Sequence, residues 1–95
     1  MIIDVDKQVY KDAEKLPAYI QVLAAKEMKA LKRASSLNEL SNIRHLKGTD
    51  EPYYRIKFNN YRFILYHHVI ENIIEVLSLT HRKDTYKKQN LPWNK

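Results

Sequence analysis

The sequence predicts an α+β fold in which two N-terminal helices pack on one face of an antiparallel β-sheet and a short helix ends the chain. Apolar residues recur at helical spacing in the first third of the chain, and three runs typical of β-strands follow in its second half. The chain has 95 residues, of which 44% are hydrophobic and only one is Gly, which favours one folded domain over residues 1–95.

The N-terminal part is predicted to form one strand and two helices. Residues 1–5 are rich in Ile and Val, which favours a first strand. Asp6 is suited to cap a short helix, and Pro17 suits the first turn of a second helix because its missing N–H has no partner there. The second helix is expected to end near Ala34, before two serines that favour a turn. Its apolar side comprises Ile20, Leu23, Ala24, Met28 and Leu31.

The C-terminal part is predicted to be a series of strands. After a loop or short helical turn, a short strand is expected around Arg44–Lys47. Three longer strands follow, at Tyr53–Phe58, Tyr61–His68 and Ile73–His81. Asp84 is suited to cap a last short helix over residues 85–89, and residues 91–93 are expected to return to the body of the protein.

The first two of these long strands are joined by Asn59-Asn60, which suits a two-residue hairpin turn because Asn tolerates a positive φ. Side chains alternate along a strand, so this turn sorts them onto two faces. The first face is apolar and should lie under the helices; it carries Tyr54, Ile56, Phe58, Tyr61, Phe63, Leu65 and His67. The second, called the cationic face below, carries Tyr53, Arg55, Lys57, Arg62, Ile64, Tyr66 and His68.

The cationic face indicates that the protein binds a polyanion. The turn places Lys57 opposite Arg62, and such a like-charge pair is unfavourable unless an anion lies between the two side chains. Arginine presents a planar fork to phosphate, and aromatic rings stack on nucleobases. The net charge of +6 agrees with an RNA partner. A solvated face or an interface with an acidic protein would give the same pattern.

The last long strand is apolar in both parities, as suits a central strand. Uninterrupted alternation along it sends Leu77 and Leu79 to the core. The same alternation assigns one further set to the face of Arg82, namely Thr80, Ser78, Val76 and Ile74. The strand end and the loop after it carry polar side chains suited to chemistry, namely His81, Arg82, Lys83 and Tyr86.

Several classes of protein and site are excluded by the sequence. The chain has no Cys, which excludes disulfides and thiolate metal sites, and its His residues predict no zinc or magnesium site. Its first residues lack the basic start and apolar run of a signal peptide, and no segment is long and apolar enough to span a membrane. We therefore expect a cytoplasmic protein with no membrane partner, no metal and no cofactor.

The run YYRIKFNNYRFILY, followed by a strand that ends in THRKDTY, resembles the C-terminal half of RelE-type toxins of the RelE/ParE family. The helical first half is similar in arrangement, so the resemblance covers nearly the whole chain. It implies a toxin of a type II toxin–antitoxin system that inhibits translation by cleaving mRNA in the ribosomal A site without a metal. It also implies a cognate antitoxin as partner, with operator DNA bound through the toxin–antitoxin complex.

The resemblance also assigns site residues. The catalytic cations of the family fall at Arg55, Lys57, Arg62 and Arg82, and Tyr86 follows them. Arg55 stands where the prototype has a lysine. Because arginine stays protonated and is a poor proton shuttle, Arg55 is expected to hold phosphate. Lys83 is expected to hold phosphate as well.

RNA cleavage through attack of the ribose 2′-OH needs a base, stabilisation of the phosphorane and an acid. Histidine is the side chain best suited to exchange protons near neutral pH. We therefore expect His81 and Tyr86 to transfer protons or position the nucleobase, while the cations hold the phosphate. Lys57 is a further candidate for the base.

Two other functions remain open at this point. A ParE-like inhibitor of DNA gyrase would share the fold without being a nuclease, and a catalytically inactive module would only bind its antitoxin. ParE-type chains generally lack this set of basic sheet residues and the terminal tyrosine. The sequence therefore favours a ribosome-dependent endoribonuclease.

Overall fold

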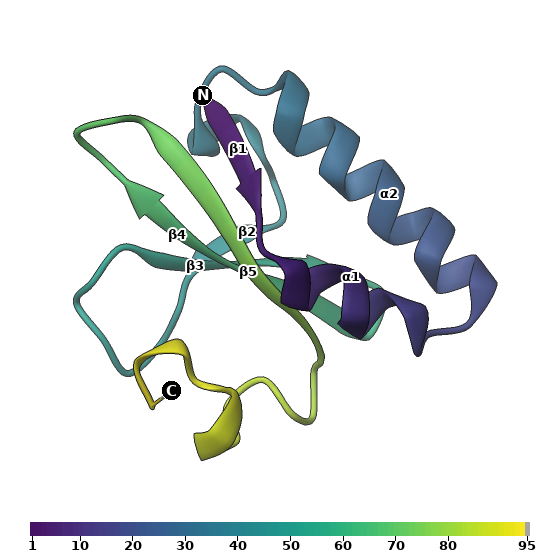
Figure 1. The fold of residues 1–95 in the computed structure, drawn as a ribbon. Helices are drawn as coiled ribbons and strands as arrows, with labels where there is room; N and C mark the ends of the chain where they lie inside the picture. The colour runs from purple at the N-terminus through teal and green to yellow at the C-terminus, as the bar shows by residue number, and fades with distance from the viewer. Residues whose placement is uncertain (95) are drawn as a thin grey trace.

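The computed structural model describes residues 1–94 and has two helices on one face of a five-stranded sheet (Figure 1). The predicted α+β class is confirmed. Lys95, the last residue of the predicted domain, lies outside the described residues. The helices are α1 (Lys7–Glu14) and α2 (Ala18–Arg33). The strands are β1 (Ile2–Val5), β2 (Ile43–His45), β3 (Tyr53–Phe58), β4 (Tyr61–His68) and β5 (Ile73–His81), in the spatial order β1-β5-β4-β3-β2.

Both helices begin where the sequence predicts. The Asp6 side chain accepts a hydrogen bond of 2.9 Å from the backbone N–H of Gln8 and caps α1. Pro17 precedes the first residue of α2, and Ala34 ends that helix with an extended backbone. Within residues 1–94, neither helix combines the length and hydropathy needed to cross a membrane.

One hydrophobic core lies between the helices and the sheet. Leu65 of β4 and Ile74 and Val76 of β5 have no exposed surface. The buried members of this core are Val9, Ile20, Ala24, Leu31, Leu37, Ile56, Phe58, Phe63, Leu65, Ile74, Val76 and Leu79. Burial of these side chains holds the helical layer on the face of the sheet opposite Arg55 and Arg62.

The sheet departs from the predicted antiparallel arrangement at one edge. β1 pairs with β5 in parallel, with Ile2 opposite Ile73 and Val5 opposite Val76. This pairing joins the first strand to the last. The pattern of neighbouring residues in each strand does not indicate whether two strands so far apart in the chain pair in parallel or in antiparallel. The short strand expected at Arg44–Lys47 is β2, which pairs with β3 in antiparallel.

A β-bulge in β5 changes which side chains face the core. Ile64 of β4 lies opposite Ser78, but the next residue, Leu65, lies opposite Val76, so Leu77 is an extra residue. The prediction that Leu77 joins the core is therefore wrong, and so is the placement of Val76 and Ile74 on the face of Arg82. The burial of Leu79 is confirmed.

Asp12 of α1 stabilises the strand directly after this bulge. Its Oδ2 accepts a hydrogen bond of 2.9 Å from the backbone N–H of Leu79, and its Oδ1 accepts one of 2.8 Å from Gln8 Nε2. β1 ends at Val5, opposite Val76, so β5 has no strand on that side at Leu79. The carboxylate of α1 thus takes the place of the missing strand.

We expect replacement of Asp12 by alanine to lower the free energy of unfolding by about 1–3 kcal/mol, because a half-buried backbone N–H loses its partner. Urea denaturation of the purified protein measures this change. Glu14→Ala, on the exposed side of the same helix, serves as the control and should leave the midpoint nearly unchanged. Equal midpoints for both variants would show that Asp12 does not hold the bulge.

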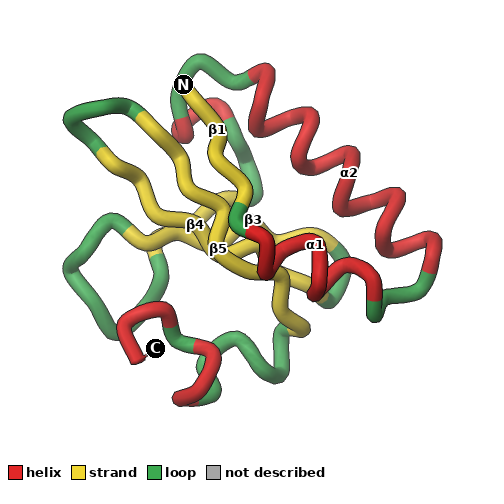
Figure 2. The backbone as a smooth tube through the Cα atoms, in the orientation of Figure 1, coloured by secondary structure: helices red, strands yellow, loops and turns green. Residues whose placement is uncertain are grey.

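The C-terminal segment, residues 82–94, crosses the face of the sheet opposite the helices (Figures 1 and 2). The short helix predicted over residues 85–89 lies further along the chain and is not an α-helix: the segment forms turns and two short 3-10 helices, Lys88–Asn90 and Pro92–Asn94. Five residues are too few to offset the cost of nucleating an α-helix. Thr85 is only 2% exposed and shares a hydrogen bond of 2.9 Å with Thr80. The predicted return of residues 91–93 is confirmed by Trp93, whose ring centroid lies 5.6 Å from that of Tyr53.

Candidate nucleic-acid interface

The hairpin of β3 and β4 has the predicted register. Lys57 lies opposite Arg62, and Phe58 opposite Tyr61. Asn59 has the expected positive φ, 52°. Because side chains directly opposite each other point to the same side of a sheet, the cations of β3 and β4 share the face that points away from α1 and α2.

Two further cations join this face from neighbouring elements. Arg44 of β2 lies opposite Arg55, so the sheet carries a second like-charge pair. The backbone N–H of Arg82 donates to the carbonyl of Asn60 at 2.7 Å, which extends the pairing of β5 by one residue and puts Arg82 beside the hairpin turn. Sequence reasoning missed Arg44, because its role depends on the pairing of β2 with β3.

Arg62 is the most crowded of these cations. Burial lowers the pKa of its guanidinium, and the positive charges of Arg55 and Arg82 lower it further, whereas the nearby Tyr86 acts in the opposite direction. Its Nη1 donates to the carbonyl oxygen of Tyr61 at 3.1 Å. An arginine remains charged at physiological pH even so. Arg55, Arg62, Arg82 and Tyr86 therefore lie close enough to interact, as the sequence predicts.

Among residues 1–94, no carboxylate forms an ion pair with the cations of this cluster. The ion pairs within residues 1–94 are His68 with Glu75 and Lys87 with Asp84. None of the cations of the cluster takes part in them. A group of uncompensated positive charges around a half-buried arginine is a site for an anion, because field lines concentrate where water is partly excluded.

The C-terminal segment partly covers the cationic face. Ile64, in the middle of this face, is 1% exposed. Tyr86 belongs to the segment but is itself 45% exposed, and its hydroxyl accepts a hydrogen bond of 3.3 Å from the backbone N–H of Lys47. The segment thus packs on part of this face, through Thr85 on Thr80, and holds the Tyr86 phenol beside Arg62.

The structure does not bring His81 to this cluster. His81 lies opposite Tyr61, and their ring centroids are 5.2 Å apart in an edge-to-face arrangement. Tyr61 packs against the core under the helices, so His81 and Arg62 occupy opposite sides of the sheet. The Nδ1 of His81 accepts a hydrogen bond of 3.1 Å from the backbone N–H of Lys83. The Lys83 side chain is exposed in the turn after β5.

Comparison with known proteins finds similarity at the level of structure. No protein-family model and no curated protein matches the chain. A chain of the RelB–RelE antitoxin–toxin complex from Methanococcus jannaschii is 26% identical, with a TM-score of 0.72 over 87% of this chain and 94% of that one. A chain of the archaeal RelE–RelB complex from Pyrococcus horikoshii is 24% identical, with a TM-score of 0.68 over 85% of this chain and 93% of that one.

The isolated RelE toxin of E. coli has the same fold at lower identity. It is 20% identical, with a TM-score of 0.58 over 84% of this chain and 82% of that one. The matches extend from the helical half of the chain into the strands that carry the cationic cluster. The chain therefore has the fold of the RelE toxins over most of its length and is a RelE-like protein.

Proposed function

We propose that this RelE-like chain is the toxin of a type II toxin–antitoxin system and that it cleaves mRNA on the ribosome without a metal. The observation that supports this most directly is the cluster of Arg55, Arg62 and Arg82 beside Tyr86, with no carboxylate paired to it among the described residues. RNA offers what this cluster lacks, namely a dense row of negative phosphates.

The proposed reaction uses the ribose 2′-OH as nucleophile on the adjacent phosphate. The bond from phosphorus to the 5′-oxygen of the next nucleotide breaks, and the products are a 2′,3′-cyclic phosphate and a free 5′-OH. Negative charge builds up on the phosphorane, and Arg55, Arg62 and Arg82 are positioned to stabilise it. Arg62 contributes most, because its partial burial strengthens its interaction with the developing charge.

Proton transfer is assigned to the groups that share the face of Arg62. Tyr86 is exposed beside that arginine, and Lys57 lies directly opposite it. We propose Tyr86 as the principal proton-transfer group and Lys57 as the second. Lys83, exposed in the turn after β5, would hold a flanking phosphate. His81 is not assigned to proton transfer, because its ring packs on Tyr61 on the helical side of the sheet.

The same face would bind the cognate antitoxin. The Methanococcus and Pyrococcus structures are complexes of a toxin with its antitoxin. We propose that an antitoxin of this chain presents carboxylates to Arg55, Lys57 and Arg62 and thereby blocks access of mRNA. Operator DNA would be bound through the resulting complex. The substrate lies on ribosomes, so the proposed site of action is the cytoplasm.

Incubation of the purified protein with ribosomes that carry a defined mRNA tests this proposal. We expect cleavage at a codon in the A site, with a 5′-OH on the downstream fragment, in the presence of a metal chelator that leaves the ribosomes intact. Addition of the antitoxin should abolish cleavage. Intact mRNA together with inhibited supercoiling by gyrase would instead support the ParE-like alternative, and inactivity in both assays would indicate a pure binding module.

A further inference from the structure

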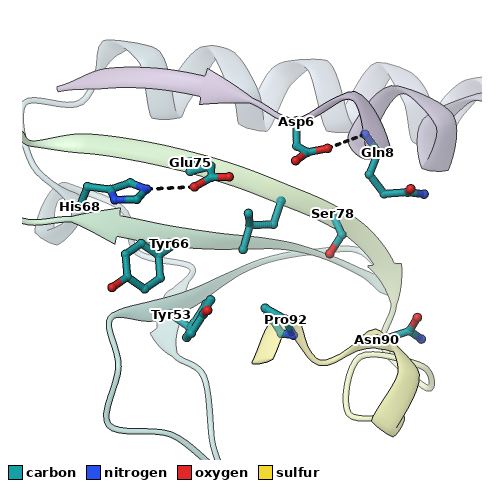
Figure 3. A pocket seen from close by; sticks show the side chains of 10 residues that line it. Asp6, Gln8, Tyr53, Tyr66, His68, Glu75, Ser78, Asn90 and Pro92 are labelled. Atoms are coloured by element: carbon teal, nitrogen blue, oxygen red, sulfur yellow. Dashed lines mark hydrogen bonds and ion pairs between the residues drawn. The ribbon is translucent and has the colours of Figure 1, made fainter. Parts of the chain in front are cut away.

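A depression of about 600 Å³ lies on the cationic side of the sheet, and its lining includes Tyr53, Tyr66 and His68 (Figure 3). Its floor includes Tyr53, Tyr66 and Glu75, which are direct neighbours across β3, β4 and β5. The start of α1 borders it on one side, where Asp6 lies, and the C-terminal segment borders it on the other, where Pro92 lies.

Aromatic rings dominate this floor. The ring centroids of Tyr53 and Tyr66 are 4.8 Å apart, and those of Tyr66 and His68 are 4.7 Å apart, both in edge-to-face arrangements. The ring of Trp93 also lies next to that of Tyr53. Rings held edge to face leave ring surfaces open to a planar ligand, and aromatic side chains are the usual stacking partners of unpaired nucleobases.

The charge of the depression is opposite to that of the arginine cluster. Among the described residues, its lining includes Asp6 and Glu75 but no lysine or arginine. Burial raises the pKa of both the Tyr53 and the Tyr66 phenol, and the carboxylate of Glu51 adds to the effect in each case. Both phenols therefore stay protonated at neutral pH. Carboxylates repel phosphate, so this end of the face suits an uncharged ring with hydrogen-bond donors.

We propose that this depression is a nucleobase subsite for the RNA substrate and that it prefers adenine, cytosine or guanine to uracil. The inference rests on the proposed function. The Glu75 carboxylate already accepts from His68 at 2.9 Å and retains further acceptor capacity. Adenine, cytosine and guanine offer it an exocyclic amino group. The pairing edge of uracil has one N–H between two carbonyl oxygens. These oxygens are hydrogen-bond acceptors and are repelled by the carboxylate of Glu75.

The subsite and the phosphate site are neighbours along β3. Tyr53 and Arg55 lie two residues apart on the same face of that strand, which separates them by about 7 Å. One short RNA segment can therefore place a phosphate among the arginines and an adjacent base on the aromatic floor. The aromatic end would select the base, and the cationic end would act on the phosphate.

Glu75→Gln tests the preference and conserves the size of the side chain. An amide both donates and accepts hydrogen bonds, so it no longer favours an amino group over a carbonyl oxygen. Ribosome-bound mRNAs that differ in a single base of the A-site codon provide the probes. The wild type should cleave the three amino-bearing variants about tenfold or more faster than the uracil variant at one codon position. Glu75→Gln should remove most of this preference. Glu71→Gln removes the same charge from an exposed position outside the lining and should retain it.

Tyr66 variants test the stacking surface. Tyr66→Ala should raise KM about tenfold with a smaller change in kcat, since loss of one stacked base costs roughly that much in affinity. Tyr66→Phe keeps the ring and should retain the wild-type KM. Thermal unfolding checks that Tyr66→Ala folds. If this variant does not fold, the Glu75→Gln and Tyr66→Phe variants test the subsite instead. A wild-type base preference in Glu75→Gln would overturn the proposal.

An NMR titration separates this inference from the proposed function. Trinucleotides whose 2′-OH groups are methylated can bind but cannot be cleaved, and the probes carry either cytosine or uracil in the middle. We expect the cytosine probe to shift the amide signals of Tyr53, Tyr66 and Glu75 more than the uracil probe. Such shifts with a protein that fails to cleave mRNA would remove the nuclease function but retain the subsite. Equal shifts with the two probes, or no shifts with either, would overturn the subsite. The same holds if these amide signals shift on addition of the antitoxin but not on addition of either trinucleotide.

Discussion

Replacement of Arg62 by alanine is expected to reduce the rate of cleavage of ribosome-bound mRNA by about 10²- to 10³-fold, as loss of one preorganised charge-stabilising group does in other enzymes. Arg62 is half-buried between Arg55, Arg82 and Tyr86, so water cannot replace its guanidinium well. Single-turnover cleavage on programmed ribosomes measures the effect. Cells in which expression of the alanine variant is induced should grow normally, because the variant has lost its toxicity.

Two variants control this result. Arg62→Lys keeps the charge but loses the planar fork, so its rate should lie between those of the wild type and the alanine variant. His81→Ala removes a ring that packs on Tyr61 on the other side of the sheet, and its rate should stay close to that of the wild type. If His81→Ala abolished cleavage while Arg62→Ala did not, the site would lie on the helical side and the assignment of the cationic face would be wrong.

Replacement of Tyr86 by phenylalanine should lower the cleavage rate by about 10²-fold, at the lower end of what positioned acids and bases contribute. The substitution keeps the ring and removes only the hydroxyl, which lies on the face of Arg62 and accepts a hydrogen bond from the Lys47 backbone at 3.3 Å. Cleavage under single-turnover conditions separates the chemical step from binding, and the fragments should be the same as those of the wild type.

The Tyr86 result has a matched control in Tyr19→Phe, which removes a hydroxyl from an exposed position on α2. This variant should cleave at the wild-type rate. A Tyr86→Phe variant with wild-type activity and an inactive Tyr86→Ala variant would mean that the ring stacks on a base and that Lys57 is the better candidate for proton transfer. Urea denaturation should accompany both substitutions, because the Tyr86 hydroxyl also helps to hold the C-terminal segment.

The like-charge pairs of the cationic face indicate a conflict between stability and function. Lys57 opposite Arg62 and Arg44 opposite Arg55 each destabilise the sheet, because cross-strand neighbours of equal charge repel. A bound polyanion removes this repulsion and stabilises the folded state by the free energy of its binding. Local rules of stability are commonly violated at functional sites, and here each of the two pairs contains an arginine proposed to hold phosphate.

Local patterns in the sequence predict most helices and strands of this protein and the composition of its cationic face. Helical spacing and strand alternation are properties of neighbouring residues, so both N-terminal helices and the strands at Tyr53–Phe58, Tyr61–His68 and Ile73–His81 were predictable. The two-residue turn at Asn59-Asn60 also specified a register, because a hairpin of that length pairs fixed positions.

Which distant residues complete the site depends on contacts between segments that are far apart in the chain. A bulge of one residue at Leu77 reverses the facing of the strand on either side of it, and no periodicity reports where alternation slips. The pairing of Arg44 with Arg55 depends on contact between segments far apart in the chain. So do the position of Tyr86 over the sheet and the aromatic depression beside Glu75, because such contacts depend on how whole elements pack and not on the residues next to each one in sequence.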